Sequence, residues 1–480
     1  MNYRAVTYVL GKIFIVIGAL MLLPITISLY YSEKLTIAFL VPSALLIFIG
    51  ILLVVFKPER RTIYTKEGLV ICGLSWIIMS AFGALPFVIS HTIPAFIDAF
   101  FETCSGFSTT GATILTEIES LPKSILFWRS FTHWIGGMGI LSFMIAIIPK
   151  GESHSMFIMK AEVPGPKAGK VVSKIQESAR ILYIIYCALT LIEIFVLNFF
   201  TKMRFFDAVT TAFSTAGTGG FSVLNNSILG YNSAKIEWIL IVFMFLFGVN
   251  FNLYFFVLIK RFSSAFKNEE FWTYVALNVT SVTLITLNIA ENYNRISDAI
   301  RDAAFNVNAI MSTTGFGTAD FDKWNTFCKV ILVGLMFVGG CVGSTGGGMK
   351  VTRIMLYFKQ MHADIKKALR PNAIIKIRMN GNVVEKKVIQ GTNSYLLINL
   401  GIMIVSIFVV SLNGFDFVST VTSVISCLNN IGPGLGIVGP TGNYASFSVL
   451  SKLVFCFDML AGRLELFPIL ILFAPRTYKK

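Results

Sequence analysis

The sequence predicts an all-α membrane protein that crosses the bilayer many times. Its mean hydropathy is +0.74, and 14% of its 480 residues are charged, whereas about a quarter are charged in soluble proteins. An apolar helix of about 20 residues spans a hydrocarbon core of ~30 Å. Apolar runs that we expect to cross the membrane lie at residues 10–30, 35–56, 69–90, 125–148, 181–200, 236–259, 271–290, 327–342, 389–412 and 447–473.

The formal net charge of +15 is spread unevenly along the chain. Lys and Arg gather in alternate loops, at 57–66, 150–180, 260–267, 353–387 and 476–480, while acidic residues collect in the loops between them. Basic loops stay in the cytoplasm, so we expect both termini there. Binding of nucleic acid or another acidic partner is the alternative explanation, but the alternation favours membrane topology and no nucleic acid.

Four polar windows that contain glycine recur between the apolar runs. Three read "DAFFETCSGFSTTGAT", "DAVTTAFSTAGTGGFS" and "DAAFNVNAIMSTTGFG", and in each an aspartate precedes a glycine by thirteen residues. A fourth, weaker copy, "STVTSVISCLNNIGPG", has serine in place of aspartate. The paired residues are Asp98 and Gly111, Asp207 and Gly220, Asp302 and Gly315, and Ser419 and Gly432.

Each window predicts a helix that is too short to span. Asp or Ser is a favourable N-cap, with Asp416 a further candidate in the fourth copy. At 1.5 Å per residue, ten residues of helix measure ~15 Å, about half a bilayer. Irregular backbone at membrane depth survives only beside a water-filled cavity or buried in protein. We expect four units, each of spanning helix, half-helix, glycine-bearing loop and spanning helix.

Four such loops around one axis would form a cation-selective pore. Glycine permits backbone conformations that other residues avoid, and rings of inward carbonyl groups replace the hydration shell of a cation. The C-terminal ends of the half-helices add negative partial charge. The alternative is that Ser, Thr and Gly serve only close helix packing. The shared thirteen-residue register favours the pore.

At these residues the chain resembles the Trk/Ktr/HKT superfamily of potassium transporters, and within it the TrkH branch. The resemblance covers nearly the whole chain. It implies four membrane–pore–membrane units and two extra N-terminal helices, near 5–30 and 35–56. The motifs that carry it are "GFSTTGAT", "WIGGMGIL", "STAGTGGFS", "MSTTGFGTADF", "FVGGCVGSTGGGMK", "LNNIGPGLG" and "GRLELFPILILF".

The implied division of the chain follows the four units. We expect an N-terminal helix pair at 1–60 and pore units at 61–150, 151–262, 263–370 and 371–480. The third unit would carry an intramembrane gating loop at 339–350.

The resemblance implies a selectivity filter of backbone carbonyl groups, with K⁺ as the transported ion and no organic cofactor in this chain. Each unit departs from the TVGYG of strongly selective potassium channels, so we expect fewer ion sites and weaker discrimination. Related plant transporters that favour sodium have serine at the first glycine, which here is Gly111. Potassium, with rubidium tolerated, is the implied ion. The implied ligands are the carbonyls of Thr110, Gly111, Gly219, Gly220, Thr314, Gly315, Ile431 and Gly432.

The stretch "GGCVGSTGGGMK" at 339–350 interrupts an apolar run. Each glycine disfavours helix by about 1 kcal/mol, so the helix stops here. A nucleotide-binding loop would need a βαβ context that the sequence lacks, and a break for close helix packing is a second alternative. The resemblance implies a gate below the filter. Its expected residues are Gly343, Gly346, Gly347, Gly348, Lys350 and Arg463.

Ionisable residues lie inside the last apolar run. Such groups usually face a cavity or one another. In one interpretation Arg463 pairs with Asp458 or Glu465 and holds helices together. In the other, Arg463 faces the permeation path near the gate and raises a barrier to cations, with Lys350 a weaker candidate for the same role.

These features predict potassium uptake, inward down the membrane potential. A sodium- or proton-coupled symporter is the alternative. Paired broken helices with acidic ligands would characterise it, whereas the glycine windows favour backbone coordination. The seven cysteines contain no CxxC and the four histidines are dispersed. Without a catalytic cluster in the sequence, a membrane transferase is disfavoured and we expect no enzyme.

The resemblance also implies partners and a location. We expect a homodimer, surrounded by membrane lipid, in the inner membrane of a bacterium. The cytoplasmic loops are too short and irregular for a nucleotide-binding domain, so nucleotide control would come from a cytosolic TrkA-like subunit that binds NAD or ATP.

Overall fold

The computed structural model describes residues 1–58, 63–139 and 175–478. These residues are mostly helical, with one hairpin formed by β1 (Arg378–Met379) and β2 (Asn382–Val383). The end of the run at 125–148, most of the basic loop at 150–180 and the expected boundaries after residues 60 and 150 fall outside the described residues.

Six helical segments of the described chain are long and apolar enough to cross a membrane. A mostly helical, multi-pass membrane protein is therefore confirmed. The segments are α1 (Tyr3–Leu20) with α2 (Leu23–Tyr30), α3 (Thr36–Val55), α4 (Thr65–Ile89), α9 (Ile175–Thr201), α14 (Glu269–Ile289) and α18 (Lys386–Val410).

Four shorter helices carry the polar windows. They contain 12, 13, 16 and 12 residues, too few for a bilayer. We name them the half-helices: α5 (Phe96–Phe107), α10 (Phe205–Gly217), α15 (Ile296–Met311) and α19 (Phe417–Leu428).

The helix starts differ from most of the predicted N-caps. Asp98 and Asp207 lie in first turns and Asp302 deeper in α15, because these helices begin earlier than expected. In the fourth window the N-cap is Asp416, not Ser419: the Asp416 carboxylate accepts a hydrogen bond from the backbone N–H of Ser419 at 3.0 Å. Acidic residues in a first turn still favour the helix, because they face the positive end of its dipole.

The helix that follows each half-helix is short or bent. The run at 327–342 forms one short helix that ends at Val338. The prediction of one continuous helix is wrong for the runs at 236–259 and 447–473, because hydropathy does not register a break between two apolar pieces. The first of these bends by 91°. The helices are α6 (Lys123–Met138), α11 (Ala234–Gly248) with α12 (Phe251–Leu258), α16 (Thr326–Val338), and α20 (Val449–Arg463) with α21 (Phe467–Phe473).

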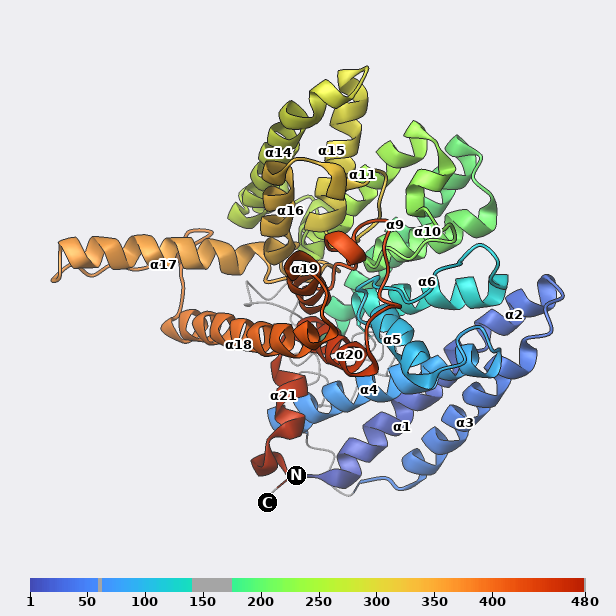
Figure 1. Cartoon of the computed structure of the whole chain (residues 1–480). Helices are drawn as coiled ribbons and strands as arrows, with labels where there is room; N and C mark the ends of the chain where they lie inside the picture. Colours follow the sequence, from blue (N-terminus) through green and yellow to red (C-terminus); the bar gives the residue numbers. More distant parts are fainter. Residues whose placement is uncertain (59–62, 140–174, 479–480) are drawn as a thin grey trace.

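The half-helices and their following helices close into a ring. Each following helix packs against the next half-helix: α6 against α10, α11 against α15, α16 against α19, and α20 against α5. Figure 1 shows α1, α3 and α4 together on one side of this ring. The half-helices therefore converge on a common centre.

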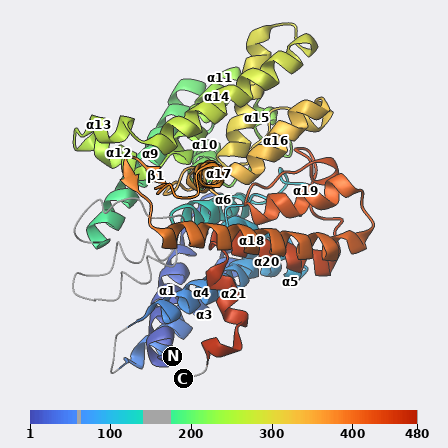
Figure 2. The same ribbon diagram turned by 90° about the vertical axis from the view of Figure 1, so that its left-hand side faces the viewer.

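Two features lie at the periphery. The termini are neighbours, since the Tyr3 hydroxyl donates to the Tyr478 carbonyl at 3.0 Å (Figure 2). Helix α17 (Val351–Leu369) runs outward from the body in Figure 1. The remaining short elements are α13 (Phe262–Phe266), η1 (Ser227–Tyr231), η2 (Ala290–Asn292), η3 (Phe321–Lys323), η4 (Ser411–Asn413), η5 (Gly436–Val438) and η6 (Pro475–Thr477).

Helices α1 and α3 approach each other at two glycines. A methyl group added at Gly50 would lie 2.7 Å from the Gly11 carbonyl oxygen, and one added at Gly11 would lie 2.8 Å from the Gly50 carbonyl oxygen. Small residues let membrane helices pack this closely. The N-terminal helix pair is therefore a tightly packed unit.

We predict that Gly50→Ala lowers the free energy of unfolding by about 1–3 kcal/mol, because an added methyl overpacks this contact. Gly401→Ala is the matched control: it lies in α18 with no atom within 4 Å of the added methyl, and loss of a helical glycine stabilises by about 1 kcal/mol. Thermal unfolding in detergent measures both. Equal melting temperatures for the two variants would contradict the prediction.

Candidate functional site

All four half-helices end in the same backbone motif. The residue two positions before each window glycine has a left-handed conformation, with φ of 56° at Thr109, 55° at Thr218, 63° at Thr313 and 56° at Asn430. A left-handed residue commonly ends a helix, but it is usually glycine. Three threonines and an asparagine in this conformation are strained, so the surrounding structure must hold them in place.

Backbone hydrogen bonds satisfy the freed carbonyl groups at these helix ends. The N–H groups of Thr110, Gly219 and Ile431 donate to carbonyls five residues earlier, at 2.9, 2.8 and 3.0 Å. After α15 the N–H of Gly315 donates to the Ala309 carbonyl at 3.0 Å. The chain therefore leaves helical geometry with these groups paired.

The four window glycines form a closed ring, because each packs against the backbone carbonyl of the residue that precedes the next window glycine. A methyl added at Gly111 would lie 1.9 Å from the carbonyl oxygen of Gly219. A methyl added at Gly220 would lie 2.1 Å from the carbonyl oxygen of Thr314, and one added at Gly315 would lie 2.0 Å from that of Ile431. A methyl added at Gly432 would lie 2.7 Å from the carbonyl oxygen of Thr110. Positive φ, between 76° and 100° at these glycines, and the close approach leave no room for a side chain.

The structure thus brings together all eight residues expected at the filter. The side chains beside them differ from unit to unit. The Ser108 and Thr110 hydroxyls lie 2.7 Å apart, as do those of Ser312 and Thr314. The equivalent space at Gly219 is filled by the buried ring of His133, which stacks on Phe221 with centroids 4.1 Å apart.

Asn430 ties the fourth, weaker window into the ring. Its amide nitrogen donates to the Thr110 hydroxyl at 3.0 Å and to the Met459 carbonyl at 2.8 Å. The phenol of Tyr444 donates to the Gly432 carbonyl at 2.8 Å. We call the loop at each window glycine a wall of the ring and number the walls in chain order. The asparagine that replaces threonine in the fourth wall therefore joins that wall to the first.

A cavity of about 120 Å³ lies against the ring. All four window glycines line it, together with residues that follow them, such as Thr113 and Ser222. Polar groups predominate around it, so it can hold water or a hydrated ion.

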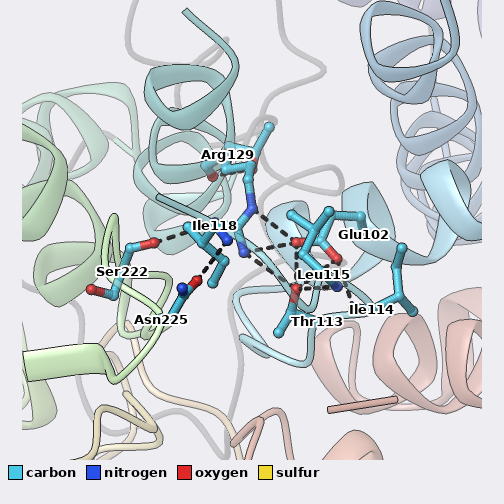
Figure 3. A network of polar contacts seen from close by, with 9 residues as sticks. Glu102, Thr113, Ile114, Leu115, Ile118, Arg129, Ser222 and Asn225 are labelled. Carbon is cyan, nitrogen blue, oxygen red and sulfur yellow. Dashed lines mark hydrogen bonds and ion pairs between the residues drawn. The ribbon is translucent and has the colours of Figure 1, made fainter. Parts of the chain in front are cut away.

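A buried ion pair, which the sequence did not reveal, stands behind the first window (Figure 3). Arg129 of α6 and Glu102 of α5 approach to 2.8 Å, and their side chains are 1% and 0% exposed. Glu102 accepts hydrogen bonds from the Thr113 hydroxyl at 3.0 Å and the Ile114 N–H at 3.1 Å. Arg129 stands within the apolar run at 125–148, which is a signal for a functional or paired charge.

The glycine-rich loop lies against two walls of the ring. The Gly347 N–H donates to the Thr313 hydroxyl at 2.7 Å. A methyl added at Gly346 would lie 2.8 Å from the Ser312 carbonyl oxygen, and one at Gly347 would lie 2.5 Å from that of Asn429. Gly348 packs on Gly339 instead. Gly346 and Gly347 thus lie beneath the third and fourth windows, on the helix side.

The first half of this loop fills the bend between α11 and α12. The Cys341 N–H donates to the Gly248 carbonyl at 2.9 Å, and the Phe251 N–H donates to the Gly343 carbonyl at 3.1 Å. Glu270 of α14 accepts the Val342 N–H at 2.7 Å. Gly343 therefore lies at the bend and not against the ring.

Arg463 holds the second half of the loop. Its guanidinium donates to the Thr345 carbonyl at 2.6 Å and to the Gly136 and Gly137 carbonyls at the end of α6, at 2.5 and 2.6 Å. The Lys350 ammonium donates to the Gly346 carbonyl. Both cations expected at the gate therefore contact the glycine-rich loop.

The acidic residues near Arg463 have contacts with other groups. Glu465 forms a 2.7 Å ion pair with Arg353 of α17, and Asp458 accepts a hydrogen bond from the Ser406 hydroxyl at 2.8 Å. The contacts of Arg463 with the loop place its guanidinium beside the residues expected to form the gate.

Comparison with known proteins is consistent along the whole chain. A family model described as "TrkH: Cation transport protein" matches residues 36–478. The chain belongs to the TrkH family. It is 36% identical to the Trk system potassium uptake protein TrkH of Salmonella typhimurium and 35% identical to that of Escherichia coli K12, each over 100% of both chains.

A solved structure supports the same conclusion. The crystal structure of the potassium transporter TrkH from Vibrio parahaemolyticus superposes with a TM-score of 0.89 and 31% identity, covering 100% of both chains. The present chain thus has the TrkH fold and belongs among transporters, not enzymes.

Proposed function

We propose that this protein takes up potassium across the bacterial inner membrane through a channel-like pore. The closed ring of four glycines, each against the carbonyl of the residue before the next, is the observation that carries the proposal. Relatives named for potassium uptake support the choice of ion.

The proposed architecture has four membrane–pore–membrane units around this ring, preceded by two further helices, with the unit boundaries given above. Cyclic packing of each following helix on the next half-helix supports it. The neighbouring termini would both be cytoplasmic, in agreement with the basic loops.

In this proposal backbone carbonyls replace the water around K⁺. The candidates are the carbonyls of the residue before each window glycine and of the glycine itself. The half-helix C-terminal ends point negative partial charge toward the ion. Entry is driven by the membrane potential, worth ~2.3 kcal/mol per charge per 100 mV.

We also propose that the glycine-rich loop gates the pore. It lies directly against the third and fourth walls, and Arg463 and Lys350 place positive charge beside it. A cation that leaves the ring on this side meets both an obstruction and electrostatic repulsion. Displacement of the loop would remove the obstruction.

Regulation would come from other chains. We propose that a TrkA-like nucleotide-binding subunit in the cytosol acts through α17, which directly follows the loop and protrudes from the body (Figure 1). A homodimer is proposed on the same family grounds.

Potassium, rubidium and sodium fluxes into liposomes, with and without a proton gradient, test the proposed function. We expect potassium and rubidium to enter passively and faster than sodium. Flux that requires a sodium or proton gradient would favour the coupled symporter, and equal entry of all three ions would contradict a potassium filter.

We predict that Gly315→Ser lowers the preference for potassium over sodium, because a side chain at Gly315 would displace the Ile431 carbonyl. Gly317→Ser is the matched control, since its nearest neighbour is an ordinary contact at 3.6 Å. Relative permeability in liposomes measures both. Unchanged preference in a folded Gly315→Ser protein would refute the filter assignment.

We predict that deletion of Gly346–Gly348 increases flux without changing ion preference, since it removes the backbone that lies beneath the ring while the windows stay intact. The variant is purified as a monodisperse protein and reconstituted into liposomes, and its potassium flux is compared with that of the unmodified protein. Unaltered or abolished flux in a folded variant would count against the gate.

A further inference from the structure

We propose that the buried pair of Arg129 and Glu102 is a positioning element for ion selectivity. It would fix the distance between the first and second walls of the ring. This inference rests on the proposed filter but concerns residues outside it.

The ion pair contacts the backbone beyond two window glycines. Glu102 accepts from Thr113 and Ile114, just after Gly111. Arg129 donates to the Ser222 carbonyl at 3.3 Å, two residues after Gly220, and its guanidinium lies 4.1 Å from the ring centroid of Phe221. One side chain thus connects α6 and two adjacent walls (Figure 3).

The other three junctions between walls also have polar contacts just beyond the glycines. Gly317 donates its N–H to the Ser227 hydroxyl at 3.2 Å. The Asp322 carboxylate accepts the Gly436 N–H at 3.2 Å. The Tyr444 N–H donates to the Thr113 carbonyl at 2.8 Å. These contacts and the ion pair form a belt around the ring, with the ion pair at the junction of the first and second walls.

Stability alone is a poor reason for this pair. Burying two charges carries a desolvation cost that their attraction often fails to offset, and apolar replacements are often equally stable. An apolar pair could not hold two loops at fixed positions, because it forms no directed hydrogen bonds. A filter that discriminates by size and field must resist closing on the smaller sodium ion, so a fixed separation of the walls favours potassium.

Arginine suits this position better than lysine. Its planar guanidinium presents several donors in a rigid fork, whereas an ammonium is a compact point charge. Arg129 uses that fork to reach Glu102, the Thr113 hydroxyl and the Ser222 carbonyl. A lysine would keep the charge next to Glu102 but lose the contact with the second wall.

The test is relative permeability of Arg129→Lys in liposomes. We expect a folded protein whose potassium-over-sodium preference falls by roughly tenfold, comparable to the loss of one hydrogen bond to a charged group. Thr113→Val removes one hydrogen-bond donor to Glu102 and keeps both charges, so it should also lower the potassium-over-sodium preference. This variant provides the test if Arg129→Lys does not fold. Arg301→Lys is the matched control. Arg301 lies in the third half-helix, α15, and pairs with Glu237 of α11 and with Asp298. The potassium-over-sodium preference of this variant should not change.

The outcomes separate this inference from the proposed function. If the unmodified protein prefers potassium and Gly315→Ser loses that preference while folded Arg129→Lys and Thr113→Val keep it, the positioning role is overturned and the filter stands. A change of equal size in Arg301→Lys would also overturn it, as a general packing effect. If the unmodified protein has no preference, the proposed function itself fails.

Discussion

The requirement that irregular backbone be enclosed at membrane depth governs this structure. Unpaired N–H and C=O groups are costly in hydrocarbon, so a loop that leaves a helix there must be surrounded by protein or line a cavity. Each window loop meets the requirement through its neighbours, since the carbonyl of one wall packs against the glycine of the wall before it. Strain of order 1–3 kcal/mol at each left-handed threonine persists because the ring leaves no other conformation. The loops therefore depend on one another.

The same requirement connects the bent helices to the glycine-rich loop. The break after Gly248 frees its carbonyl, and the loop supplies the Cys341 N–H; in return Phe251 donates to Gly343. A movement of the whole loop would leave these groups unpaired, at about 1–3 kcal/mol for each buried group. Movement confined to Gly346 and Gly347, under the ring, would preserve the hydrogen bonds at the bend. The first half of the loop is thus fixed by the bend, whereas the second half is held by Arg463, Lys350 and Thr313.

The sequence was informative where the signal was local and silent where it was tertiary. The thirteen-residue register located all four half-helices and the four window glycines, because helix end and loop are encoded in one short window, whereas the residues before those glycines were expected from the family resemblance. Asp98, Asp207 and Asp302 were wrong as N-caps, because packing extends those helices backward. Hydropathy missed the bends at 249–250 and 464–466, since apolar residues flank both. Glu102 gave no sign of its partner 27 residues away, because only the fold brings them together.

The four walls share a backbone conformation but not their side chains, which explains why the divergent sequence of the fourth window still fits the ring. Thr110, Gly219, Thr314 and Ile431 occupy equivalent places, yet they range from no side chain to a large apolar one. What the ring requires of each is a carbonyl group and a glycine after it. Side chains are then free to differ according to what lies behind each wall: His133 fills the space beside Gly219, and Asn430 reaches the Thr110 hydroxyl. A ring of this kind constrains glycines strictly and their neighbours loosely, so asparagine and isoleucine complete the fourth wall without breaking its geometry.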